Sequence, residues 1–165
     1  MIRAILHADK NWGIGKSNSL MFSLPQDMKF FRETTSGKTV LMGENTLLSF
    51  PGGKPLKNRT NVVLSLNLER DDCIIVRSLD EAFEELKKSE TDVYVIGGAS
   101  VYRQMLPYCE EVLVTKVYEE GDADTFFPNL DEHEDFECVY QSEEIDDNSH
   151  KIRFTTYKNN NVKNI

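Results

Sequence analysis

The sequence lacks the hydrophobic segments that mark membrane and secreted proteins. None of its apolar runs approaches the roughly 20 residues that a membrane-spanning helix needs. The first residues have too short an apolar run for a signal peptide, and no small-residue cleavage site follows them. We therefore expect a cytoplasmic protein with no membrane partner. A length of 165 residues suits one domain with a substantial core.

Cysteine and histidine are too scarce for metal-binding or nucleophilic chemistry. Cys73, Cys109 and Cys138 are odd in number and have no metal-ligand spacing, which favours small, reduced, buried thiols. The three histidines do not cluster along the chain, and no Ser-His-Asp or Cys-His set stands out. We expect neither a metal site nor a protein nucleophile.

Basic residues are missing from one long stretch. The net charge is −9, and thirteen acidic residues with no Lys or Arg lie between Lys116 and Lys151. A nucleic-acid-binding protein would show a basic stripe, so we expect no nucleic-acid partner. The acidic stretch is typical of a solvated surface. The first 116 residues carry equal numbers of acids and bases and can form an anion-binding cleft.

The order of the expected elements predicts an α/β fold. Apolar runs that suit strands alternate with amphipathic segments that suit helices. The expected strands are residues 2–8, 39–42, 61–66, 73–76, 93–96, 111–118, 136–142 and 152–158, and helices follow Leu24, Gly43, Leu79 and Gly98. This order predicts a single domain with a central, mostly parallel, twisted sheet of about eight strands, four helices on its two faces and a C-terminal antiparallel strand pair. We place the domain at residues 1–158 and expect a frayed tail at residues 159–165.

The helix expected after Leu24 carries an informative carboxylate. Pro25 suits the first helical position, and Asp27 falls in the first turn. Phe30 and Phe31 lie three and four residues on, close to the same face. A carboxylate on an apolar face is costly unless it has a partner, so Asp27 is a candidate functional group. A solvated acid that interacts with the helix dipole is the alternative.

Two glycine turns, at Gly43 and at Gly97-Gly98, each follow a buried strand and precede a helix. Glycine lets backbone N–H groups approach a phosphate closely. Two such turns in one small domain favour a dinucleotide, although the usual fingerprint of three glycines is absent. Plain strand-to-helix turns are the alternative.

Two further segments are candidates for ligand contact. Residues 9–19 are rich in Gly, Asn and Ser and predict a long loop, of the kind that often forms a lid. Arg59 lies in a polar run at the head of a strand and suits a bidentate hold on a carboxylate. A solvated arginine with no ligand is the alternative.

Taken in order, these segments resemble dihydrofolate reductase over residues 2–157. Residues 11–16 are similar to the start of that family's mobile active-site loop, residues 24–27 with Phe31 to its substrate helix, residues 57–61 to its arginine turn, residues 95–98 with Tyr102 to its nicotinamide site, and residues 124–128 to the loop that braces the lid. Several separate motifs in the right order are specific together.

The resemblance implies an NADPH-dependent oxidoreductase. It would transfer a hydride to C6 of 7,8-dihydrofolate and protonate N5, giving tetrahydrofolate for one-carbon metabolism. Asp27 would bind the pterin and promote its protonation, with Thr115 supporting Asp27 through its hydroxyl and Phe22 as a further catalytic position. Arg59 would hold the glutamate α-carboxylate, and Asp124 would accept hydrogen bonds from the closed lid. We expect a monomer that also binds antifolate inhibitors.

The resemblance also implies the residues that line each subsite. The substrate-binding residues would be Ile5, Leu6, Leu20, Leu24, Asp27, Met28, Phe31, Arg32, Phe50, Arg59, Ile96 and Tyr102. The cofactor-binding residues would be His7, Ile14, Gly15, Ser19, Leu20, Gly43, Glu44, Asn45, Thr46, Leu64, Ser65, Leu66, Arg77, Ile96, Gly97, Gly98, Ala99, Ser100, Val101, Tyr102, Gln104 and Thr125.

Four positions depart from the family's usual pattern. Phe22 stands where Trp is usual and cannot hydrogen-bond a water near the pterin. Glu44, Leu66 and Ser100 stand where basic or polar residues are common near the 2′-phosphate of NADPH. We therefore expect a narrower preference for NADPH over NADH than is usual, with Ser65 and Arg77 left to hold the phosphate.

Two other functions are possible at this point. A non-catalytic α/β domain could keep a nucleotide cleft for regulation, but it would not need both Asp27 and Arg59. Another pteridine or pyrimidine reductase is the second alternative. Arg59 argues against it, because that side chain is useful chiefly for a glutamate tail.

Overall fold

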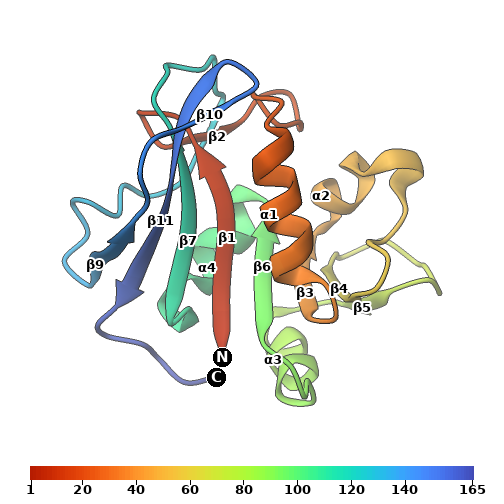
Figure 1. Cartoon of the computed structure of the whole chain (residues 1–165). Coiled ribbons are helices and arrows are strands. Elements are labelled where there is room, and N and C mark those ends of the chain that lie inside the picture. Colours follow the sequence, from red (N-terminus) through yellow and green to blue (C-terminus); the bar gives the residue numbers. More distant parts are fainter.

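A computed structural model describes the whole chain, residues 1–165, around one large twisted sheet (Figure 1). Its strands are β1 (Ile2–Ala8), β3 (Thr39–Gly43), β4 (Thr60–Leu64), β5 (Ile74–Val76), β6 (Val93–Gly97), β7 (Glu111–Val117), β9 (Phe136–Gln141), β10 (Ile145–Asp147) and β11 (His150–Asn159). They follow the order β10-β11-β7-β1-β6-β3-β4-β5, with β9 paired to β11. A small second sheet joins β2 (Gly13–Gly15) to β8 (Thr125–Phe126).

The direction of the strands confirms the predicted mixed sheet. β1 runs parallel to β6 and β7, and β3 runs parallel to β4 and β6. β11 is antiparallel to β7, β9 and β10. The sequence reading missed β10, because only three residues form it and two of them are acidic.

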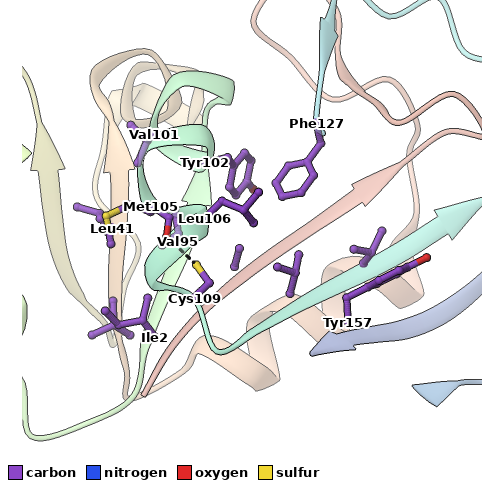
Figure 2. Packing of buried hydrophobic residues seen from close by; sticks show 14 of the residues in the cluster. Ile2, Leu41, Val95, Val101, Tyr102, Met105, Leu106, Cys109, Phe127 and Tyr157 are labelled. Atoms are coloured by element: carbon purple, nitrogen blue, oxygen red, sulfur yellow. Dashed lines mark hydrogen bonds between the residues drawn. The ribbon is translucent and has the colours of Figure 1, made fainter. Parts of the chain in front are cut away.

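The helices cover both faces of the sheet, as predicted. Helices α1 (Pro25–Thr35) and α2 (Glu44–Ser49) lie over one face, and α3 (Leu79–Lys87) and α4 (Ala99–Met105) lie over the other. Side chains alternate along β3, so that Leu41 joins the α3/α4 core and Met42 joins the α1/α2 core. Figure 2 shows Met105 of α4 packed close to Leu41 and Val95. No helix is both long and apolar enough to cross a membrane.

The C-terminal tail, for which the sequence predicts fraying, makes contacts with the body of the protein. Asn159 ends β11 and is buried, with its side chain donating to the carbonyl of Cys109. The backbone N–H groups of Asn160 and Lys163 donate to Asp135 and Pro107, and Ile165 packs against the core. The local sequence is polar, and the partners of the tail come from distant elements.

The cysteines differ from expectation in their burial. Cys109 is buried, and its burial raises the pKa of its thiol to about 12. Cys73 is half-buried, and Cys138 is exposed. Cys138 lies on β9, which is an edge strand with only its first residue buried, so burial does not follow from residue type there.

Candidate active site

A cavity of about 600 Å³ lies at the carboxyl ends of β1 and β6, between α1 and α4. The strand order places β6 between β1 and β3, although it follows both in sequence. Ligands of α/β sheets bind at such a reversal of strand order. Ten of the 22 lining residues are hydrophobic, and Asp27 is the one acid among them. The cavity therefore suits a flat apolar ligand with a few polar groups.

Asp27 is held at this cavity from two neighbouring strands. The residue is 9% exposed, and its Oδ1 accepts a hydrogen bond from the hydroxyl of Thr115 at 2.7 Å. Its Oδ2 lies 3.3 Å from Nδ1 of His7. His7 on β1 and Thr115 on β7 are partners in the parallel register, so both side chains reach the same carboxylate. The predicted support of Asp27 by Thr115 is confirmed.

A second carboxylate, Asp147 of β10, fixes the start of α1. Leu24 stands at the N-cap of α1 and supplies no side-chain hydrogen bond. The carboxylate of Asp147 instead accepts from the backbone N–H groups of Gln26, at 3.0 and 3.1 Å, and of Asp27, at 3.1 Å. Asp147 is 1% exposed. Asp147 thus caps the N-terminus of α1 in place of Leu24 and so positions Asp27.

The two glycine turns lie against each other beside the cavity. Gly97 has a φ of 131°, which favours glycine, and a Cβ there would lie 3.1 Å from the hydroxyl of Thr46. A Cβ at Gly43 would lie 3.2 Å from a methyl of Val101. Gly43 and Gly98 begin α2 and α4 without any side-chain cap. The turns thus leave room and backbone donors for a phosphate-bearing cofactor.

Arg59 lies near the last turn of α1. Its Nη1 donates to the hydroxyl of Thr35 at 3.3 Å, and its Nε donates to the carbonyl of Lys57 at 2.9 Å. Burial and, second, the positive charge of Arg32 lower the pKa of Arg59. Neither arginine forms an ion pair with a carboxylate of the chain. Two unpaired guanidinium groups near each other suit an anionic ligand.

Glu44, Ser65 and Arg77 meet at the ends of β3, β4 and β5. The hydroxyl of Ser65 donates to the carboxylate of Glu44, and Nη1 of Arg77 donates to the carbonyl of Ser65 at 3.0 Å. The Ser65 hydroxyl also accepts from the backbone N–H of Leu68 at 3.0 Å. Leu66 is 80% exposed. The side chain of Glu44 thus points toward Ser65 and accepts the hydrogen bond of its hydroxyl.

The loop at residues 9–19, which the sequence predicts as a lid, is held in place near both of its ends. β2, which that reading missed, pairs with β8, and Trp12 is buried. The carboxylate of Asp9 accepts from the backbone N–H groups of Asn11, Gly13 and Gly121. The backbone N–H of Ser17 donates to Asp124 at 3.0 Å, as predicted.

Comparison with known proteins identifies the family. A family model described as "Dihydrofolate reductase" matches residues 1–160. The chain belongs to the dihydrofolate reductase family. The dihydrofolate reductase of Bacillus subtilis (strain 168) is 37% identical over 134 residues, which cover 80% of this chain and 78% of that protein. The dihydrofolate reductase of Haemophilus influenzae is 38% identical over 117 residues, covering 71% of this chain and 72% of that protein.

A solved dihydrofolate reductase has the same architecture. The structure "Dihydrofolate reductase from Enterococcus faecalis complexed with NADP(H)and RAB-propyl" matches with a TM-score of 0.88 and 31% identity. The match covers 97% of this chain and 96% of that one. These findings confirm the predicted fold and the predicted enzyme class, an oxidoreductase that reduces dihydrofolate with NADPH.

Most of the residues predicted for this family's site line the cavity. Those that do are Ile5, Leu6, His7, Ile14, Gly15, Ser19, Leu20, Asp27, Met28, Phe31, Asn45, Thr46, Phe50, Ile96, Gly97, Gly98, Ala99, Tyr102 and Thr125. Those outside its lining are Phe22, Leu24, Arg32, Gly43, Glu44, Arg59, Leu64, Ser65, Leu66, Arg77, Ser100, Val101, Gln104 and Thr115. Among the latter, Gln104 donates its side-chain hydrogen bonds to Ser100, on the exposed side of α4.

The sequence reading missed several residues that shape the site. Asn18, Ser49 and Pro51 also line the cavity. The cap formed by Asp147 and the loop anchor formed by Asp9 were missed because their partners lie on other segments. An acid directly after a buried strand, as Asp9 is, is the one local signal that could have marked an anchor.

Proposed function

We propose that Asp27 is the group through which this chain reduces dihydrofolate. One observation carries the proposal: Asp27 is the one acid that lines the cavity, it is nearly buried, and no Lys or Arg neutralises it. A carboxylate in that setting needs a ligand that offers hydrogen-bond donors. The pterin of dihydrofolate offers two, at N3 and at the 2-amino group.

The side chains around Asp27 divide the work of binding the pterin. The hydroxyl of Thr115 occupies one lone pair of Oδ1 and fixes the plane of the carboxylate. Phe31 and Phe50 supply apolar walls for the pterin and the benzoyl group. The negative charge of Asp27 favours the pterin protonated at N5.

The cofactor region of the cavity suits NADPH. When bound, NADPH supplies the hydride that reduces the pterin. Gly43, Gly97 and Gly98 would hold its diphosphate, because a side chain at the first two would clash or crowd. Ile14 and Ile96 line the cavity nearby and exclude water from the reacting atoms. The hydroxyl of Tyr102 donates to the carbonyl of Ile5 at 2.7 Å, and burial raises its pKa. That hydroxyl serves to hold α4 against β1.

The remaining assignments of the chain follow from charge and shape. Arg59, with Arg32 beside it, would hold the α-carboxylate of the glutamate tail. The net charge of −9 opposes nucleic-acid binding. We further propose that the chain acts as a monomer in the cytoplasm, as one domain that includes its docked tail, and that antifolates bind where the pterin binds.

The substitution Asp27→Asn tests this proposal. We expect dihydrofolate reduction at neutral pH to fall by about 10²- to 10⁴-fold, because the charge that favours the protonated pterin is lost. Activity should rise as the pH falls, since substrate protonated in solution bypasses the missing group. The measurement is the rate of NADPH oxidation with dihydrofolate from pH 5 to pH 9.

Asp71→Asn provides the matched control, because Asp71 is exposed and outside the cavity. It should behave as the wild type across the pH range. Near-normal turnover of Asp27→Asn at pH 7 would show that Asp27 is not the group that promotes protonation.

A further inference from the structure

His7 is a second titratable side chain in the wall of the active site. It lies on β1, is 7% exposed and lines the cavity. Its Nδ1 is 3.3 Å from Oδ2 of Asp27, whereas its Nε2 is buried and has no hydrogen-bond partner. A separation of 3.3 Å is at the long limit of a hydrogen bond, and catalytic contacts often tighten when substrate binds.

The chemistry of the pair determines which nitrogen carries the proton. An ionised carboxylate only accepts hydrogen bonds, so Nδ1 of His7 must be the donor to Asp27. A neutral ring then has its bare nitrogen at Nε2, where nothing satisfies it. A second proton at Nε2 would make His7 a cation beside the carboxylate. The contact with Asp27 thus selects the tautomer of a neutral His7 ring that has its proton on Nδ1.

The hydrogen bonds to Asp27 leave room for the pterin. Thr115 donates to Oδ1 and His7 can donate to Oδ2, so each oxygen keeps one lone pair free. Two parallel donors of a pterin need one acceptor on each oxygen. The two protein contacts thus turn the carboxylate so that both free lone pairs face the cavity.

We propose that His7 is a positioning residue for this reaction: its Nδ1–H donates to Oδ2 of Asp27 and holds the carboxylate in the orientation that the pterin needs. This inference rests on the proposed role of Asp27. If His7 only filled space, its Nδ1 would not need to carry a proton, and an apolar side chain of similar size could replace His7 without loss of activity.

Other charged groups near the pair are engaged elsewhere. Asp147 accepts from the backbone at the start of α1. The ring of Phe22 lies 6.0 Å from the ring of His7 and 5.1 Å from that of His150, measured between centroids. The ring of His150 is hydrogen-bonded to Glu119. His7 and His150 both contact Phe22 but not each other. Phe22 separates the His150–Glu119 pair from Asp27, so His7 is the group in direct contact.

The ¹⁵N NMR signals of the His7 ring, in the ligand-free protein at neutral pH, test the proposal without any turnover. We expect a protonated Nδ1 in the wild type and a changed proton distribution in Asp27→Asn. A wild-type ring with its single proton on Nε2 would overturn the proposal. The NMR measurement does not depend on activity. It therefore tests the contact between His7 and Asp27 independently of the proposed catalytic role of Asp27.

Two variants extend the test to turnover. His7→Asn places an amide N–H near the position of Nδ1 but cannot titrate, whereas His7→Leu fills space without a donor. We expect kcat/KM at pH 7 to fall roughly ten- to a hundredfold in His7→Leu and clearly less in His7→Asn. Rescue of activity by His7→Asn relative to His7→Leu would show that the hydrogen-bond donor, and not the volume of the ring, supports Asp27.

His133→Asn is the matched control, because His133 lies outside the cavity lining and contacts Phe136 edge-on. Its kcat/KM at pH 7 should match the wild type. If His7→Leu is as active as His7→Asn, His7 only fills space. Should His7→Leu not fold, the wild-type tautomer and the activity of His7→Asn decide the question.

Discussion

At the scale of single residues, Glu44 has the largest expected effect on cofactor choice. A 2′-phosphate carries nearly two negative charges, so a carboxylate beside it is repulsive and a guanidinium is attractive. Glu44 takes the hydroxyl of Ser65 as its hydrogen-bond donor and so removes a donor that the phosphate would use. Arg77 remains nearby, with Nη1 engaged by the Ser65 carbonyl.

We expect Glu44→Arg to lower the KM for NADPH roughly tenfold or more, because one repulsive charge becomes an attractive one. The KM for NADH should change little. Steady-state kinetics with each cofactor measure both values. Glu90→Arg, an equal charge change at an exposed position outside the cavity, should alter neither. Equal shifts for both cofactors in Glu44→Arg would place Glu44 away from the phosphate.

Arg59 makes a second prediction at this scale. Arg59→Lys keeps the charge but loses the planar fork that holds a carboxylate by two hydrogen bonds. We expect binding of dihydrofolate to weaken by roughly ten- to a hundredfold, which corresponds to one charge-assisted contact. Ligand titration by fluorescence measures this. A pterin without the glutamate tail should bind both proteins equally well, and equal losses for both ligands would contradict the role.

At the scale of elements, the β2–β8 pair and Asp124 hold the loop that the sequence predicts as a lid. The carboxylate of Asp124 accepts from the backbone of Ser17, and this bond, followed by that from Thr125, holds the pKa of Asp124 below its usual range. Because the bond from Ser17 lowers the pKa of Asp124, the stabilisation from this bond is present above the ordinary pKa of about 3.9 and is lost as the pH falls through the lowered value. Lid closure should therefore be insensitive to pH near neutrality.

Asp124→Ala removes that acceptor. We expect slower hydride transfer with little change in NADPH affinity, because the lid loses a bond to its backbone while the cofactor cradle stays intact. Single-turnover kinetics measure the first quantity, and cofactor fluorescence titration measures the second. Asp122→Ala, which removes only the exposed partner of Lys16, serves as a control for charge. Unchanged hydride transfer and unchanged loop mobility in Asp124→Ala would rule out a bracing role.

At the scale of the whole molecule, the tail joins the end of the chain to two distant segments, at Pro107 and Asp135. The N–H groups of Asn160 and Lys163 donate to carbonyls on other segments, and Ile165 adds apolar contact. Deletion of residues 160–165 should lower the free energy of unfolding by about 2 kcal/mol, or roughly 4–8 °C in Tm. Thermal unfolding measures the shift, and kcat should be unchanged because the cavity is remote from the tail. An unchanged Tm would mean that the tail contributes nothing.

Local sequence determined the element types and the reaction-bearing positions. The bounds of the eight expected strands agree with the structure to within about two residues, because apolar periodicity and turn residues are local signals, whereas the short strands β2, β8 and β10 were not expected. Asp27, Gly43 and Gly97 could be recognised for the same reason: a first-turn acid on an apolar face and a glycine after a buried strand are visible within a few residues.

The tertiary structure alone decided how those positions are completed. The contact of His7 with Asp27 joins β1 to α1, the Asp147 cap joins β10 to α1, and Glu44 meets Ser65 across two strand ends. Each pair is separated by twenty or more residues, so no periodic pattern reports it. A buried polar group must find a partner wherever the fold brings one. Sequence could thus name Asp27 as the candidate carboxylate, and only the packed sheet could show which side chains hold it.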